Sequence, residues 1–209
     1  MPSAADPVAS TASQSPNEAE VIDRRSLNLP NLITLSRLVL SFVLFGLIWM
    51  GDLWITSAIV FVIAAATDAV DGYIARKYGL VTTLGRILDP FVDKIIICGA
   101  FVFLLARPDS GVNAWMVLAV IGREMFVTGL RSFLEQSGRD FSAVWSGKIK
   151  MALQCVAVAV ALASLSPEFS NAQFFLARDV ILWASVIVTV YSGVIYAWRG
   201  FQMLKPKGG

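Results

Sequence analysis

Four carboxylates with helical spacing are the residues of this chain best suited to chemistry. Asp68 and Asp71 stand three residues apart, and Asp89 and Asp93 stand four apart, inside or beside strongly apolar sequence. These spacings place each pair on one face of a helix, so two facing helices would gather all four acids. Four unpaired carboxylates in a dry site would repel one another and become protonated. Bound cations would keep them ionised. Oxygen ligands suit hard cations, which predicts a site for magnesium or manganese.

The composition is typical of a membrane protein. The chain has 209 residues, of which 56% are hydrophobic and only 15% charged, and its mean hydropathy is +0.69. This length suits one domain of about six spans of roughly 20 residues each. Histidine is absent, so a general base must be a carboxylate, lysine, tyrosine or cysteine. The net charge of +2 gives no reason to expect a nucleic-acid partner.

The fold we expect is an all-α membrane protein in three parts. Residues 1–26 lack the apolar core of a signal peptide and the arginine-rich helix of a transit peptide, which predicts a disordered cytosolic tail. Residues 27–204 form the membrane domain, and 205–209 a C-terminal tail. A short N-terminal interfacial helix, opened by Pro30, precedes the first span. The six predicted spans cover residues 38–50, 53–76, 85–106, 114–134, 148–165 and 174–198.

The positive charges predict the orientation of these spans. All of the 17 lysine and arginine residues except Arg107 and Arg178 fall on the same side when the connections are assigned alternately. Cytosolic loops retain lysine and arginine, so both termini are expected in the cytosol. At 1.5 Å per residue, Asp68 and Asp93 then lie about 12 Å inside the cytosolic surface. We therefore expect a multi-pass protein of the cytoplasmic membrane whose site opens toward the cytosol.

The acids belong to a longer pattern that resembles a known family. Residues 68–93 read D-x2-D-G-x2-A-R-x8-G-x3-D-x3-D, which is similar to the signature of the CDP-alcohol phosphotransferases. Members of that family displace CMP from a CDP-linked lipid or alcohol and attach the phosphoryl group to an acceptor hydroxyl. The resemblance implies that Asp68, Asp71 and Asp89 are ligands of a two-magnesium site. It implies that Asp93 is both a ligand and the base, and that six helices pair as a homodimer.

The resemblance also implies a binding site for the CDP-lipid. Its cytidine and pyrophosphate contacts correspond to Asn31, Thr34, Gly72, Ala75, Arg76 and Thr82. Chemistry agrees at two of these positions, because Gly72 leaves room for a flat base and Arg76 can grip phosphate oxygens with its planar fork. Asn31 as a plain helix cap and Thr82 as a loop hydroxyl are the alternatives.

Three further segments are similar to the phosphatidylglycerophosphate synthase branch of the family. They are residues 28–37, 122–131 and 141–150, and that branch uses CDP-diacylglycerol and sn-glycerol 3-phosphate. Independently, a basic cluster on the predicted cytosolic side would suit an acceptor that carries its own phosphate. The cluster consists of Arg123, Arg131, Lys148 and Lys150. The alternative is that these bases only fix the topology, with Glu124 as a structural partner of Arg123.

Other functions fit parts of the pattern. The acids could pair structurally with Arg76, Arg86 and Lys94, although ionisable residues inside membranes are usually functional. Intramembrane prenyl transfer also uses paired aspartates, but with motifs that lie farther apart in longer chains. A divalent-cation carrier would need polar residues along a path to the far side, where these spans are apolar. Within the family, another acceptor such as inositol phosphate remains open.

Overall fold

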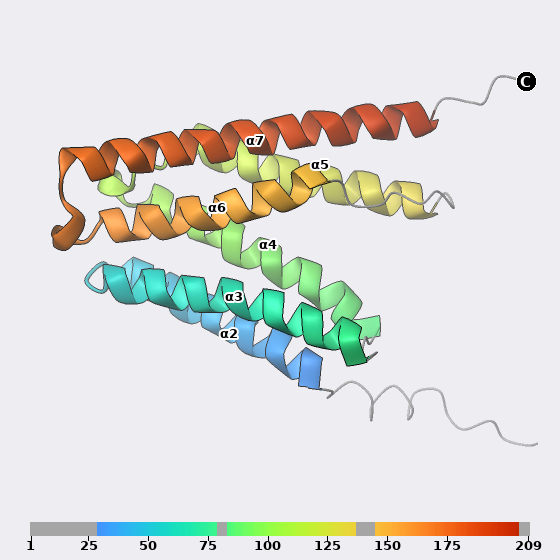
Figure 1. The fold of residues 1–209 in the computed structure, drawn as a ribbon, viewed down its shortest axis with the longest axis horizontal. Helices are drawn as coiled ribbons and strands as arrows, with labels where there is room; N and C mark the ends of the chain where they lie inside the picture. The colour runs from blue at the N-terminus through green and yellow to red at the C-terminus, as the bar shows by residue number, and fades with distance from the viewer. Residues whose placement is uncertain (1–28, 79–82, 137–144, 205–209) are drawn as a thin grey trace, which may run out of the picture.

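The computed structural model describes residues 29–78, 83–136 and 145–204, in which it contains six α-helices and no strand (Figure 1). The all-α prediction is therefore confirmed for this part of the chain. The helices are α2 (Leu29–Met50), α3 (Trp54–Tyr78), α4 (Thr83–Leu105), α5 (Ala114–Gln136), α6 (Trp145–Ser164) and α7 (Ala172–Leu204). Two short 3-10 helices, η1 (Pro108–Ser110) and η2 (Pro167–Phe169), lie in the connections after α4 and α6.

Helices α3 to α7 begin within a few residues of the predicted spans, but the first helix differs from its prediction. Residues 29–37, expected to belong to a separate interfacial helix, are continuous with residues 38–50 in α2. Pro30 is the second residue of α2, where its missing N–H leaves no helical hydrogen bond unmade. From there to Phe45 no glycine or proline interrupts the helix. The prediction of a separate helix there was therefore wrong.

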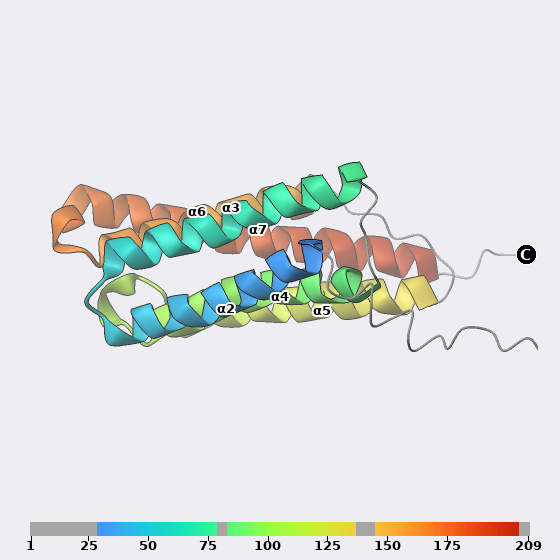
Figure 2. The ribbon, with the colours of Figure 1, turned by 90° about the horizontal axis from the view of Figure 1, so that it is seen from below.

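The six α-helices form a closed ring of neighbours. Around the ring, α2 packs on α3, α3 on α6, α6 on α7, α7 on α5, α5 on α4, and α4 on α2. Helix α4 also contacts α6 across the ring. Figure 2 shows α3 and α6 on one side of the bundle and α2, α4 and α5 on the other. This arrangement encloses an apolar core that includes Leu44, Phe61, Phe101, Met116 and Leu182, all nearly inaccessible to solvent.

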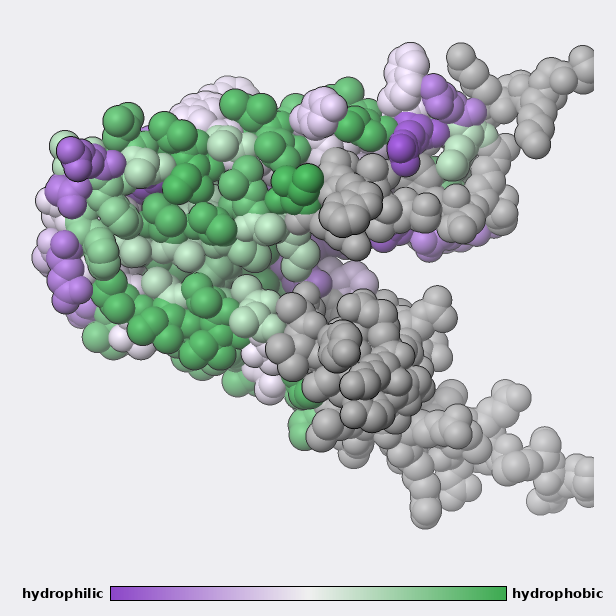
Figure 3. All heavy atoms as spheres, viewed as in Figure 1, coloured by the Kyte–Doolittle hydropathy of each residue, from purple (hydrophilic) through white to green (hydrophobic). Residues whose placement is uncertain are grey.

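The outside of the bundle is apolar as well. Large side chains such as Phe42, Trp115, Leu176 and Ile187 are more than half exposed. Figure 3 shows apolar residues over the middle of the bundle and polar residues gathered at its left-hand edge. Soluble monomers rarely expose apolar patches of this extent. Among the described residues, the segments Leu32–Met50 and Ala172–Met203 are long and apolar enough to cross a bilayer.

Two arginines connect neighbouring segments by hydrogen bonds at the end of the bundle where α2 is joined to α3. Arg107 donates two hydrogen bonds to the carbonyl oxygen of Ile48, at 3.0 and 2.7 Å, and a third to that of Trp49. Arg178 donates to the carbonyl oxygen of Asp109 at 2.6 Å and pairs with the Asp179 carboxylate. These are the two arginines that departed from the charge asymmetry. Their contacts are with the ends of helices and with a loop, so we assign them a structural role.

One close approach between α2 and α4 requires a glycine. A Cβ atom built on Gly99 of α4 would overlap the ring of Phe45, which itself stacks on Phe103. We predict that Gly99→Ala destabilises the protein by about 1–3 kcal/mol, because the inserted methyl group must displace a packed ring. The matched control is Gly46→Ala on α2, where nothing lies within 4 Å of the new Cβ. Thermal unfolding in detergent should show a lower midpoint only for Gly99→Ala, and equal midpoints would contradict the packing seen here.

Candidate active site

The four acids of the sequence pattern lie on α3 and α4. Asp68 and Asp71 fall in the C-terminal half of α3, and Asp89 and Asp93 in the N-terminal half of α4. The two helices run in opposite directions, so these halves point to the same end of the bundle (Figure 1). The side chains of Asp68, Asp71 and Asp89 lie outside the described part of the structure, as do any contacts they make. The four-carboxylate metal site therefore stays a prediction.

The residues expected to hold the CDP-lipid are placed only in part. Gly72, Ala75 and Arg76 belong to the last turns of α3, and Asn31 to the first turn of α2, but the contacts of these residues lie outside the description. Thr82 falls outside the described residues altogether. Thr34 is buried on α2, three residues before Arg37. The CDP-lipid site is thus also left as a prediction.

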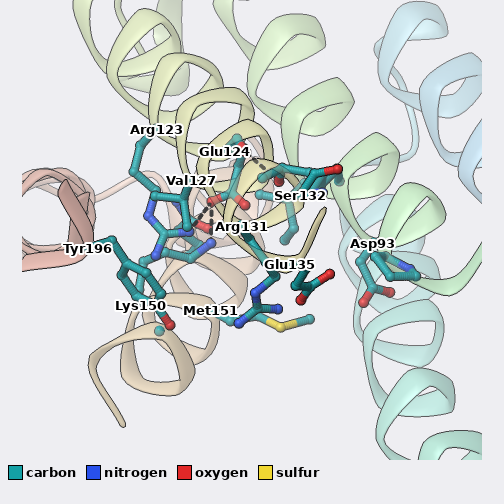
Figure 4. Close-up of a pocket in the computed structure, with 16 residues that line it drawn as sticks. Asp93, Arg123, Glu124, Val127, Arg131, Ser132, Glu135, Lys150, Met151 and Tyr196 are labelled. Atoms are coloured by element: carbon teal, nitrogen blue, oxygen red, sulfur yellow. Dashed lines mark hydrogen bonds and ion pairs between the residues drawn. The ribbon is translucent and has the colours of Figure 1, made fainter. Parts of the chain in front are cut away.

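A pocket of about 400 Å³ lies between α4, α5, α6 and α7. Its lining extends from the middle of these helices toward the end of the bundle that carries the four acids. Asp93 of α4 lies on one side of the pocket, and the basic residues of α5 and α6 lie on the other (Figure 4). The predicted base and three of the four predicted acceptor-binding residues thus line one cavity: Asp93, Arg123, Arg131 and Lys150. The side chain of Lys148 is outside the description.

Two of the basic residues in the pocket share a buried carboxylate. Arg123 Nη1 lies 3.2 Å from Glu124 Oε1, and Lys150 Nζ donates to the same oxygen (Figure 4). Glu124 and Lys150 are both buried, at 9% and 6% exposed. A buried charge is strongly destabilising unless it is paired, so Glu124 compensates the charges that Arg123 and Lys150 would otherwise carry unpaired in the interior. Glu124 is therefore the structural partner that the sequence allowed for, and it binds Lys150 as well as Arg123.

Helix α7 fixes the position of Arg123. Arg123 Nη2 donates to Ser192 Oγ at 2.7 Å, and its guanidinium carbon lies 5.4 Å from the centre of the Tyr196 ring. Gly193 lies between them in sequence, and a Cβ atom there would be 3.1 Å from Arg123 Cγ. The missing side chain at residue 193 lets α7 approach Arg123 closely. Sequence reasoning missed both Ser192 and Tyr196, because nothing in an apolar C-terminal helix indicates which of its polar residues face a site.

Arg131 differs from the other two bases of the pocket. It lines the pocket about two turns beyond Arg123 on α5, with the exposed Glu135 one turn further along. No carboxylate of the described residues lies within ion-pair distance of its guanidinium. Two arginines and one lysine, set against the buried Glu124 and the exposed Glu135, leave this side of the pocket with one excess positive charge. An anion that enters here therefore meets donors whose charge Glu124 has only partly compensated.

The Asp93 carboxylate has a partner that the sequence analysis did not single out. Arg37 of α2 donates a hydrogen bond from Nη1 to Asp93 Oδ1 at 2.8 Å. The Arg37 side chain is 1% exposed and that of Asp93 is 26% exposed, so the arginine lies behind the carboxylate and the carboxylate faces the pocket. A signal was present in the sequence, since Arg37 is the one charged residue among the 22 of α2.

The family relationship of the chain agrees with this site. A family model described as CDP-alcohol phosphatidyltransferase matches residues 27–191, which include helices α2 to α6 and the first part of α7. The chain belongs to this family. It is therefore a phosphatidyltransferase enzyme by class, with Asp68, Asp71, Asp89 and Asp93 inside the matched region.

Individual relatives cover most of the chain. A Bacillus subtilis protein is 39% identical over 193 residues, which are 85% of this chain and 97% of the relative. A Rickettsia bellii protein is 34% identical over 172 residues, which are 81% of this chain and 93% of the relative. Both are named CDP-diacylglycerol--glycerol-3-phosphate 3-phosphatidyltransferase. A Mycobacterium tuberculosis protein named probable phosphatidylglycerophosphate synthase is 33% identical over 196 residues, 91% of this chain and 90% of that protein.

Proposed function

We propose that this protein transfers the phosphatidyl group of CDP-diacylglycerol to sn-glycerol 3-phosphate, giving phosphatidylglycerophosphate and CMP. The observation that carries the proposal is the pocket in which the Asp93 carboxylate faces Arg123, Arg131 and Lys150. An acceptor with both a hydroxyl and a phosphate needs a base and an anion site within one cavity. Family membership and the names of the relatives support the same reaction.

The basic side of the pocket receives the phosphate of the acceptor. Arg123 is held by Glu124, Ser192 and Tyr196, so its guanidinium is fixed before the acceptor arrives. Arg131 adds a second planar fork, which suits two-point contact with phosphate oxygens. A phosphate monoester carries about −1.5 to −2 charges near neutral pH, which suits a side of the pocket with three basic residues, two of which share the carboxylate of Glu124. Serine, a zwitterion with no net charge, and inositol, which is neutral, would bring no phosphate to this side.

Asp93 takes the proton of the acceptor hydroxyl. The hydroxyl oxygen attacks the phosphorus that carries the diacylglycerol, a new P–O bond forms, and the bond from that phosphorus to the CMP oxygen breaks. CMP leaves with the bonding electron pair, and the proton of the hydroxyl goes to the Asp93 carboxylate. Asp93 fits this step because its carboxylate lines the pocket while Oδ1 is paired with the buried Arg37.

Asp68, Asp71, Asp89 and Asp93 would hold the magnesium ions, with manganese as a substitute. The fit rests on donor chemistry, since carboxylate oxygens are preferred by these cations and Asp93 presents one at the pocket. Bound magnesium would neutralise charge on the pyrophosphate and on the leaving CMP. Gly72, Ala75, Arg76, Asn31, Thr34 and Thr82 would hold the donor. The homodimer stays a prediction.

We further propose that all six α-helices span the membrane, with the pocket at the cytosolic side and both termini in the cytosol. The exposed apolar side chains around the middle of the bundle support a lipid-facing belt. The lysine and arginine distribution supports the orientation, because the two exceptions are structural arginines at the opposite end. A pocket at the cytosolic interface is where a lipid headgroup meets a soluble acceptor.

The role of Arg123 predicts a selective kinetic effect. Arg123→Ala should raise the apparent KM for glycerol 3-phosphate by about 10- to 100-fold, since a hydrogen bond to a charged group contributes about 1.5–3 kcal/mol. Its effect on the KM for CDP-diacylglycerol should be small. Lys150 still pairs with Glu124 in this variant, so the buried carboxylate keeps a partner. The matched control is Arg199→Ala, which removes an exposed arginine of α7 three residues beyond Tyr196. If Arg123→Ala raised the KM values of both substrates equally, Arg123 would not belong to the acceptor site.

The proposed reaction is tested with a panel of acceptors. Protein purified in detergent is incubated with CDP-diacylglycerol and magnesium, and CMP release is measured with glycerol 3-phosphate, inositol phosphate, inositol, serine or no acceptor. We expect release that depends on glycerol 3-phosphate. Release that depends on inositol phosphate instead would keep the reaction class and overturn the acceptor. No release with any acceptor from folded protein would overturn the function.

A further inference from the structure

Arg37 occupies an unusual position for an arginine of an apolar helix. It lies eight residues into α2, about 12 Å from the start of the helix at 1.5 Å per residue. A long side chain near a bilayer surface can usually extend to water. Arg37 instead turns inward, is 2% exposed, and reaches the Asp93 carboxylate on α4. The energetic cost of burying this charge is met by the acid that we assign as the base.

The surroundings of Arg37 keep it in this position. Thr34 and Ser41 precede and follow it by about one turn and are also buried, so the polar stripe of α2 faces the bundle interior. Ser41 Oγ donates to the backbone carbonyl oxygen of Arg37 at 2.8 Å. Helix α2 packs against α4. The guanidinium is therefore fixed relative to α4 before any substrate binds.

We propose that Arg37 is a positioning residue for the transfer reaction: it holds Asp93 by Oδ1 and so sets the direction of the carboxylate toward the acceptor hydroxyl. A carboxylate has two oxygens, and its χ2 torsion is soft, so several orientations of the Asp93 carboxylate are accessible. The hydrogen bond from Nη1 selects one of them. Arg37 does not touch the substrates, because its side chain is buried behind Asp93.

This inference rests on the proposed function and is distinct from a purely structural role. Arg107 provides the comparison, because it too ties α4 to α2, by hydrogen bonds from just beyond α4 to the last turns of α2. Loss of either arginine should weaken the contact between the two helices. Only loss of Arg37 should slow the chemical step in protein that is still folded.

The experiment compares Arg37→Met, Arg37→Lys and Arg107→Met with the wild type. We measure kcat and both KM values in detergent, the thermal unfolding midpoint, and Mn²⁺ binding to substrate-free protein by electron paramagnetic resonance. Arg37→Met should lower kcat about 100-fold, the loss expected from a small misplacement of a catalytic group. Both KM values should stay within about threefold, since neither substrate depends on a buried arginine for binding. The Mn²⁺ affinity should fall much less than kcat, because Asp68, Asp71 and Asp89 would still hold the metal when Asp93 is misplaced. Arg37→Lys should lower kcat about 10-fold, because lysine keeps the positive charge but lacks the planar guanidinium group.

Several results would overturn the inference. One is a kcat of Arg37→Met within about threefold of the wild type. Another is an equal loss of kcat in Arg107→Met, which would make both arginines structural. A loss of Mn²⁺ binding that matches the loss of turnover would assign Arg37 to the metal site instead. If Arg37→Met does not fold, Arg37→Lys decides by the same criteria. If the wild-type protein uses another acceptor, only the proposed acceptor is overturned. The variants are then compared with the wild type using that acceptor, and the role of Arg37 is tested in the same way.

Discussion

Asp93→Asn lowers kcat by at least about 1,000-fold, within the range that a positioned general base contributes, and largely spares CDP-diacylglycerol binding. The amide keeps the shape of the carboxylate and still offers an oxygen to Arg37 Nη1, so the packing between α2 and α4 is preserved. What is lost is the capacity to take a proton. The measurement is single-turnover CMP release, with donor binding followed separately in the absence of acceptor.

The control for Asp93→Asn is Asp52→Asn, which makes the same chemical change at an exposed residue in the turn between α2 and α3. That turn lies at the end of the bundle away from the pocket, and the control should keep full activity (Figure 1). Undiminished turnover in Asp93→Asn would remove Asp93 from its role as the base. It would also remove the reason for positioning Asp93 by Arg37.

Glu124→Gln should destabilise the folded protein by about 3–5 kcal/mol, the cost of leaving buried charges without their partner. Gln has nearly the same shape as Glu, so the cavity and the packing change little. Arg123 and Lys150 would then face each other with no carboxylate between them. Unfolding by graded addition of a denaturing detergent measures the loss.

Two further variants isolate this effect. Glu135→Gln removes an exposed carboxylate from the same helix and the same pocket, and should change stability by less than about 0.5 kcal/mol. The double variant Glu124→Gln, Lys150→Met removes a positive charge together with the negative one and should recover part of the lost stability. Equal stability of Glu124→Gln and Glu135→Gln would contradict the pairing of Glu124 with Arg123 and Lys150.

The fold was predictable because the signals for it are local. Apolar runs of span length, separated by Gly51-Asp52, Arg107–Asn113 and Ser166–Gln173, give helices α3 to α7 with nearly correct starts. The one error concerned α2, where a polar, interface-like sequence indicated a break that the helix does not have. Its polar residues Thr34, Arg37 and Ser41 face the bundle interior rather than a membrane surface.

The candidate site was predictable where spacing carries the information. The spacing of the acids placed Asp89 and Asp93 on one face of a helix. The basic residues of α5 and α6 were expected at the same, cytosolic end of the bundle as these acids. The contacts across helices were not predictable from spacing. The pairing of Arg37 with Asp93 joins residues 56 apart in the chain, and that of Arg123 with Ser192 joins residues 69 apart. Such contacts depend on which helices become neighbours in the ring.

The central claim is that the phosphatidyl group moves from CDP-diacylglycerol to glycerol 3-phosphate. The most direct test is mass spectrometry of the lipid products formed by purified protein from CDP-diacylglycerol and ¹³C-labelled glycerol 3-phosphate, with Asp93→Asn in parallel. We predict that the wild type forms labelled phosphatidylglycerophosphate in equal amount to the CMP released, and that Asp93→Asn forms almost none. CMP release without label in any lipid would contradict the account, because the donor would then be hydrolysed rather than transferred.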